Sequence, residues 1–249
     1  MGKKKKMKVK KIIYGWMPNN EISKKEKKEF VEQADKLKCN YILHENFDHV
    51  PTPDVYEKVN TYRNDNGITK GPAGAGTASN FCSHISIWHR IVKENMPCAV
   101  FEHDARPIIN FENLIDIDDG MIMLLGPRID KLDRYQFPDM EIKYYNVSNH
   151  AGSHAYAITP KTASMLIEHV EKEGINDSID QWLFLRQKPI HIEKFLKLFL
   201  VVCDPPVAVA VYGDEKGKKE SSVGRSSGPP GQPEHNLYVT PGFKEGYCE

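Results

Sequence analysis

The sequence has few cysteines, no long apolar run and no net charge. Its cysteines, Cys39, Cys82, Cys98, Cys203 and Cys248, are scattered and form no C-x-x-C pair. This excludes a disulfide framework and a cysteine-based zinc site, and it fits a reducing compartment. No apolar stretch approaches the ~20 residues of a membrane-spanning helix, and no apolar run follows the charged start as in a secretory signal. We therefore expect a soluble protein without a transmembrane segment, located in the cytoplasm, or in the host cytoplasm if the protein is viral.

Charge is balanced overall but unevenly placed. The chain has 34 Lys and Arg against 34 Asp and Glu, and seven lysines and no acid lie in residues 1–11. The rest of the chain, with 27 basic and 34 acidic residues, therefore carries about −7. An acidic body argues against a broad nucleic-acid groove. We interpret residues 1–10 as a solvated basic tail, which alternatively tethers the protein to nucleic acid or to an anionic membrane.

The order of elements indicates one α/β domain over residues 11–212. A strand over 11–16, a helix capped by Ser23 and a strand over 41–44 form a β-α-β opening typical of a parallel sheet. Further helices are predicted over 79–95, 160–172 and 179–186, and further strands over 99–104, 121–125 and 155–159. Residues 195–202 are apolar enough for a strand or a buried helix. Residues 46–77 are predicted to hold a helix over 53–62 and then a loop, and residues 213–249 a flexible C-terminal segment.

Residues 98–106 read Cys-Ala-Val-Phe-Glu-His-Asp-Ala-Arg, the most informative run in the chain. A buried strand is predicted to deliver Glu102 and Asp104 at its carboxyl end, where open α/β sheets bind their ligands. Side chains at i and i+2 of an extended segment project to the same side. The two acids can then share one divalent cation, and the other coordination positions of this cation are left for phosphate oxygens and water. This is typical of a glycosyltransferase that uses a nucleotide sugar, and the alternative is an exposed acidic turn.

Four motifs follow one another between residues 76 and 185. They read Cys82-Ser-His-Ile-Ser-Ile-Trp, Val100-Phe-Glu-His-Asp-Ala, Gly152-Ser-His-Ala-Tyr-Ala-Ile-Thr-Pro-Lys and Ile179-Asp180. In this order and spacing the chain resembles family 25 glycosyltransferases, the lipooligosaccharide sugar-transferase and collagen galactosyltransferase relatives. The resemblance implies a single Rossmann-like nucleotide-sugar-binding domain of the GT-A type, with a mixed, mostly parallel sheet flanked by helices. It also implies transfer of a sugar from a nucleotide-sugar donor, a UDP-sugar above all, to a glycan or other hydroxyl acceptor, with inversion.

Four positions depart from the family pattern. His103 stands where the middle acid of Glu-Asp-Asp is found, although an imidazole also ligates Mn²⁺. Ser79 and Asn80 replace a Gly-Cys pair, and Ser153 replaces a threonine with its hydroxyl retained. The change at His103 leaves dependence on Mn²⁺ or Mg²⁺ open.

By resemblance, the metal and the catalytic base are assigned to three acids. Glu102 and Asp104 hold Mn²⁺ or Mg²⁺, which stabilises the leaving diphosphate. Asp180 is the base that takes the proton of the attacking acceptor hydroxyl. An alternative for Asp180 is a carboxylate in the first turn of a helix, where it interacts with the helix dipole.

Residues of the glycine-containing motif are expected to line the same site. Strand alternation places Ser153 and Ala155 on one face, and His154 and Tyr156 on the other. His154 is a candidate third metal ligand, Ser153 and His103 are candidate donor contacts, and Tyr156 contacts donor or acceptor.

Three basic residues each have two interpretations. His84 contacts donor or acceptor, or it is a histidine at the edge of the core with a hydrogen bond to the backbone. Arg106 and Arg128 bind the donor diphosphate, or they form surface ion pairs.

Two other functions stay open. The acceptor is alternatively a hydroxymethylated base of viral DNA, with the lysine tail as an electrostatic tether. The replacement at His103 also allows a non-catalytic binding module of the same fold. A metal-dependent phosphohydrolase fits less well, because such sites need more acids and histidines on several strand ends.

Overall fold

The computed structural model describes residues 6–47, 75–126, 128–129, 142–146, 153–173, 178–184 and 192–211. The predicted helix over 53–62, most of the predicted loop around it and the 213–249 segment lie outside these ranges.

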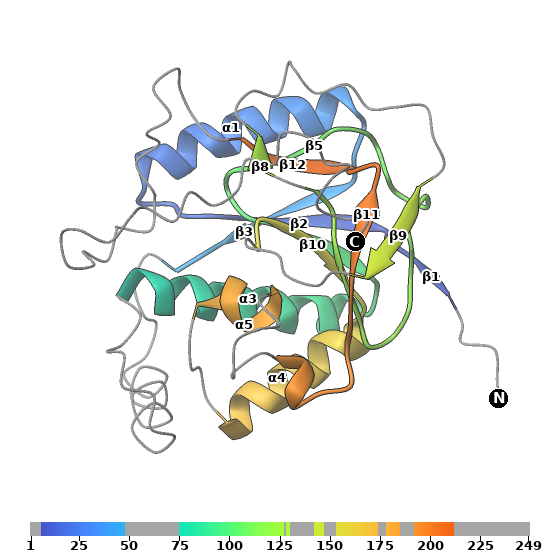
Figure 1. Cartoon of the computed structure of the whole chain (residues 1–249). Helices are drawn as coiled ribbons and strands as arrows, with labels where there is room; N and C mark the ends of the chain where they lie inside the picture. The colour runs from blue at the N-terminus through green and yellow to red at the C-terminus, as the bar shows by residue number, and fades with distance from the viewer. Residues whose placement is uncertain are drawn as a thin grey trace, which may run out of the picture.

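A seven-stranded mixed sheet forms the centre of the fold (Figure 1). Its order is β3 (Tyr41–Glu45), β2 (Lys11–Trp16), β4 (Cys98–Phe101), β10 (Ala155–Ile158), β7 (Met121–Leu124), β11 (Phe199–Asp204) and β9 (Lys143–Asn146). The strands β3, β2 and β4 are parallel, and β11 is parallel to β7. Strand β10 is antiparallel to both β4 and β7, and β9 is antiparallel to β11. The predicted mixed α/β sheet is therefore confirmed, with three parallel and three antiparallel pairings between its strands.

Helices cover both faces of this sheet and make three layers (Figure 1). Helix α1 (Glu21–Lys36) lies on one face, and α3 (Ala75–Glu94), α4 (Pro160–Glu173) and α5 (Ile179–Phe184) lie on the other, with the short helix η2 (Ile192–Lys194) next to α5. Successive strand residues point to opposite faces, so Tyr14 packs in the cluster under α1 and Ile13 in the cluster over α3. Within the described ranges, no helix is long and apolar enough to cross a bilayer.

Several element boundaries differ from the sequence-based ones. Helix α1 is capped by Asn20, whose side chain accepts the Ser23 amide at 2.9 Å, while the Ser23 hydroxyl accepts the amide of Met17. Helix α3 begins at Ala75, inside the predicted loop, and β4 ends at Phe101 rather than at residue 104. The ambiguous apolar run over 195–202 contributes to strand β11.

Two small sheets flank the central one. Strand β12 (Ala208–Val211) pairs with β5 (Ala105–Pro107) and β8 (Arg128–Ile129), and β1 (Met7–Lys8) pairs with β6 (Asp116–Ile117). Val9, just after β1, is fully buried, and its amide donates to Ile115 at 3.1 Å. Val9 packs in the core under α1. The folded part therefore begins before residue 11, where the sequence placed the start of the domain.

At Gly126 the backbone that follows β7 lies directly against the backbone at the start of β12. A Cβ at this position would lie 1.7 Å from the Ala208 carbonyl oxygen. The amides of Val207 and Ala208 both donate to the carbonyl of Leu125, so the backbone of β12 is held against Gly126.

We expect Gly126→Ala to lower the free energy of unfolding by about 1–3 kcal/mol or more, because backbone has to move to accommodate the methyl group. The matched control is Gly15→Ala, whose Cβ would meet the end of the Asn46 side chain, which can move away. Urea unfolding followed by circular dichroism measures both. An equal loss in the two variants would contradict the packing argument.

Candidate active site

A tight turn follows β4 and carries the two predicted acids. The Ala105 amide donates to the Glu102 carbonyl at 2.9 Å, which closes a β-turn over residues 102–105. Glu102 and Asp104 thus lie at the carboxyl end of β4, and both are half-buried. The extended geometry that the sequence predicted for this segment is wrong, because the chain reverses here to form β5.

The antiparallel pairing of β10 with β4 brings a second motif to this turn. Ala155, the first residue of β10, lies opposite Phe101, and the Glu102 amide donates to the His154 carbonyl at 2.8 Å. The Ser153 hydroxyl, just before β10, donates to Glu102 Oε1. The register of the two strands therefore places the start of one motif beside the end of the other.

A third motif reaches the same oxygen from α3. His84 Nε2 lies 3.1 Å from Glu102 Oε1, and His84 is only 2% exposed. His84 Nδ1 lies 2.8 Å from the hydroxyl of Tyr156. The hydroxyl of Tyr156 also accepts the indole N–H of Trp88 at 2.8 Å. We call Trp88, Tyr156, His84, Glu102 and Ser153 the Glu102 network.

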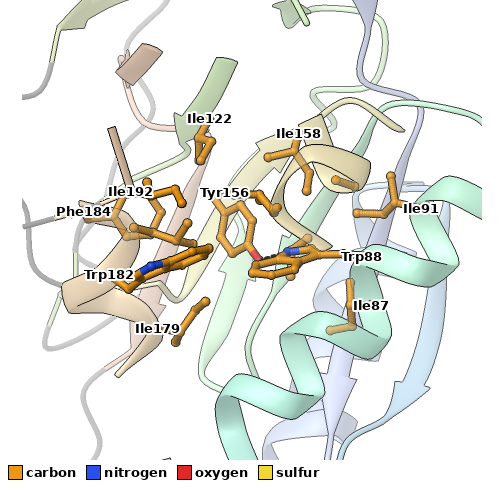
Figure 2. Close-up of a cluster of buried hydrophobic side chains, with 14 of the residues drawn as sticks. Ile87, Trp88, Ile91, Ile122, Tyr156, Ile158, Ile179, Trp182, Phe184 and Ile192 are labelled. Atoms are coloured by element: carbon orange, nitrogen blue, oxygen red, sulfur yellow. Dashed lines mark hydrogen bonds between the residues drawn. The ribbon is translucent and has the colours of Figure 1, made fainter. Parts of the chain in front are cut away.

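Figure 2 shows how this network is anchored in the core. The hydroxyl of Tyr156 points toward the indole of Trp88, and Trp182 of α5 lies on the other side of the Tyr156 ring. Tyr156 and Trp88 are both fully buried. Large aromatic side chains therefore hold the polar groups of the network in place and exclude water from them.

The hydrogen bonds of the network have one consistent direction. Tyr156 accepts from Trp88, so its own proton is available for His84 Nδ1. In the tautomer that accepts this proton at Nδ1, His84 Nε2 carries a proton that it donates to Glu102 Oε1. Burial raises the pKa of Tyr156 well above its ordinary value, the Glu102 charge adds to this effect, and the Trp88 hydrogen bond opposes it. Tyr156 therefore stays protonated.

Ser153 and Tyr156 lie on the same network, although strand alternation predicted that they point to opposite faces. The alternation fails because β10 begins only at Ala155, so Ser153 and His154 precede it. His154 is fully buried, and its Nε2 lies 2.6 Å from the Gly126 carbonyl, to which it donates. Its Nδ1 is buried as well. These contacts favour a structural role for His154 over the predicted role as a metal ligand.

The candidate ligands for a cation at this site are the carboxylates of the acid-bearing turn, Glu102 and Asp104. Among the residues that the structure describes, there is no group of three or more His, Cys, Asp or Glu side chains that could hold a metal ion. Mg²⁺ and similar cations are often bound by only one or two carboxylates, with substrate phosphates and water as the other ligands. Glu102 and Asp104, on one turn at the carboxyl end of β4, fit this sparser mode of binding.

Arg106 is buried and forms ion pairs within the protein. It is 2% exposed, and its Nη2 contacts Glu26 and, at 3.2 Å, Glu29 of α1. These contacts replace the predicted diphosphate contact, because both α1 carboxylates already neutralise the guanidinium. Arg128 lies in β8, and its side chain falls outside the described part of the chain.

Asp180 lies in the first turn of α5 and is half-buried. Its helix packs on the aromatic cluster that holds Tyr156, since the rings of Tyr156 and Phe184 lie 5.9 Å apart. The catalytic role of Asp180 stays a prediction, as do the donor contacts of His103 and Ser153.

Sequence reasoning did not identify Tyr14 as part of the site. The hydroxyl of this fully buried residue donates to the His103 carbonyl in the acid-bearing turn at 2.5 Å. A tyrosine in the middle of an apolar strand was the available signal, because a buried phenol needs a hydrogen-bond partner.

The described fold and turn define an α/β protein with an acid-bearing site at the edge of its sheet. The chain matches the family model described as glycosyltransferase family 25 (LPS biosynthesis protein) over residues 19–182. The chain therefore belongs to glycosyltransferase family 25, and this membership indicates glycosyl transfer as its general activity. A comparison with curated proteins gives no match.

We expect Tyr156→Phe to lower the free energy of unfolding by at least about 1–3 kcal/mol, because it leaves the buried Trp88 N–H and His84 Nδ1 unpaired. The control is Tyr41→Phe, which removes a hydroxyl that binds Asp35 near the surface. Chemical denaturation measures both. A loss no greater than that of the control would contradict the network.

A second prediction concerns pH. Burial, with smaller contributions from the charges of Arg90 and His84, lowers the pKa of His44 to about 4. His44 Nε2 lies 3.1 Å from the Ser86 hydroxyl. Between pH 4 and the ordinary histidine pKa of about 6.5, the unfolded chain binds more protons at this site than the folded one. This contribution to stability is therefore complete above about pH 6.5 and is lost as the pH falls toward 4.

We expect His44→Gln, which keeps a hydrogen-bonding side chain, to weaken the pH dependence of the urea midpoint between pH 7 and 5. The other titrating groups are common to both proteins and cancel in the comparison. Parallel pH profiles would show that His44 titrates normally.

Proposed function

We propose that this chain transfers a sugar from a nucleotide-diphosphate sugar, a UDP-sugar above all, to a hydroxyl acceptor such as a glycan. In this proposal the carboxyl end of β4 belongs to a donor site of the GT-A type, where Glu102 and Asp104 would hold Mn²⁺ or Mg²⁺. Membership of family 25 supports sugar transfer in general. The observation that carries the finer proposal is the hydrogen-bonded carboxylate of Glu102 on a turn shared with Asp104.

The Glu102 network supplies a preorganised negative charge. Ser153 and His84 both contact the same carboxylate oxygen of Glu102, and these hydrogen bonds orient the group. A bound Mn²⁺ or Mg²⁺ supplies Lewis-acid stabilisation of the charge on the leaving diphosphate. Glu102 and Asp104 would hold this cation, and His84 acts through Glu102 as a positioning residue.

Asp180 is our candidate for the base. A carboxylate within hydrogen-bond reach of the acceptor hydroxyl takes its proton as the oxygen attacks the anomeric carbon. Attack on the face opposite the departing diphosphate inverts the configuration at that carbon. The proton ends on Asp180, and the nucleoside diphosphate leaves with the electron pair of the broken bond.

We expect the protein to release nucleotide from one member of a UDP-sugar panel in the presence of Mn²⁺, and EDTA to abolish this release. Glu102→Gln and Asp104→Asn each remove one negative charge from the turn and should lower turnover roughly 100-fold or more. A coupled assay for free nucleoside diphosphate measures release in every case.

The matched control is Asp116→Asn, which removes a carboxylate that pairs with Lys8 at 2.9 Å in the β1–β6 sheet. It should leave turnover unchanged. Release that survives EDTA, or full turnover by Asp104→Asn, would remove the metal and the acid pair from the proposal. A folded protein that releases nucleotide from no donor would contradict sugar transfer from nucleotide sugars.

A further inference from the structure

A second set of buried contacts reaches the acid-bearing turn from the opposite side of the sheet. The carbonyl of His103, in the middle of the turn, accepts two hydrogen bonds. One comes from the Tyr14 hydroxyl at 2.5 Å and the other from Arg106 Nη1 at 3.0 Å. Arg106 Nη1 also donates to the Ala105 carbonyl at 2.9 Å. Both of these side chains therefore bind backbone atoms of the turn itself.

Arg106 connects the turn to α1. Its Nη2 donates to carboxylate oxygens of Glu26 and Glu29, and Glu26 is itself buried at 6% exposure. The planar guanidinium can donate to carboxylates and to carbonyls at the same time, which an ammonium group does with much less geometric control. We call Tyr14, Arg106, Glu26 and Glu29 the α1 network.

Tyr14 is fully buried and packs against α1. Its ring stacks on Phe30 of α1, with centroids 3.9 Å apart and an interplanar angle of 15°. Burial is the main reason why the pKa of Tyr14 is raised, with Glu26 and Asp104 adding to the rise and Arg106 opposing it. The hydroxyl therefore keeps its proton, which it donates to the His103 carbonyl, at the ordinary pKa of tyrosine and above.

A turn of this kind has little intrinsic order. The one backbone hydrogen bond that closes it, from Ala105 to Glu102, fixes few of its dihedral angles against the conformational entropy of the chain. The Glu102 network acts on the Glu102 side chain from the α3 face, whereas the α1 network acts on the backbone of the turn. The position of Asp104, which follows His103 directly, depends on the second network.

We propose that Tyr14 and Arg106 are positioning residues that hold the His103 carbonyl and thereby set the geometry of Glu102 and Asp104 for cation and diphosphate binding. The expected effect on catalysis rests on the proposed function. The ordering of the turn can be tested without a substrate. Neither residue touches the reacting atoms.

The test compares Tyr14→Phe with Tyr41→Phe. Both rings pack against Phe30, and each hydroxyl donates one hydrogen bond, but only that of Tyr14 goes to the turn, since Tyr41 binds Asp35 at 3.0 Å. Hydrogen exchange by NMR reports on the Ala105 amide, which closes the turn. The Glu102 amide, paired with β10, is the internal reference.

In Tyr14→Phe we expect exchange of the Ala105 amide to accelerate roughly tenfold while the Glu102 amide is unchanged, as fits the loss of one hydrogen bond. Tyr41→Phe should change neither. With the UDP-sugar and Mn²⁺, turnover by Tyr14→Phe should fall roughly tenfold at a melting temperature close to that of Tyr41→Phe. Arg106→Lys keeps the charge but loses the planar guanidinium, so it should accelerate exchange of the Ala105 amide as well. If this variant does not fold, Tyr14→Phe decides alone.

The outcomes separate this inference from the proposed function. Unchanged exchange at Ala105 in Tyr14→Phe overturns the positioning role, whatever the activity. Faster exchange with unchanged turnover also overturns it, because the turn would then be loosened without effect on the acids. Faster exchange in a protein that acts on no nucleotide sugar supports the ordering of the turn and rejects the proposed function.

Discussion

A carboxylate that is only 13% exposed at the edge of a buried sheet needs hydrogen-bond donors, and Glu102 obtains two of them on one oxygen. The donors come from segments far apart in the sequence, His84 on α3 and Ser153 before β10. They meet because β10 pairs with β4 in a single antiparallel register. A shift of this register by one residue would carry Ser153 away from Glu102 and turn Tyr156 from the α3 face of the sheet.

The site is continuous with the core on both faces of the sheet. On the α3 face, a directed chain of hydrogen bonds runs from Trp88 through Tyr156 and His84 to Glu102. On the α1 face, Tyr14 and an arginine paired with two glutamates bind the backbone of the same turn. Well-packed interiors transmit displacement. The positions of the two acids therefore depend on these core contacts more than on the turn alone.

These contacts also explain how the turn accommodates His103 in place of an acid. Two of the contacts that hold this residue go through its backbone carbonyl, which every amino acid has. These two contacts therefore do not depend on which side chain stands at position 103.

The sequence by itself determined the local features: the β-α-β opening, the strand before the acids, the helix after Pro160 and the resemblance to family 25. Each is encoded in periodicity, capping or a short motif, which nearby residues set on their own. Only the tertiary structure decided that the acids lie in a turn, that Ser153 and Tyr156 act together, and that Arg106 and His154 are turned inward. Those outcomes depend on strand register and on which buried donor finds which acceptor, and such pairings join segments that no local pattern relates.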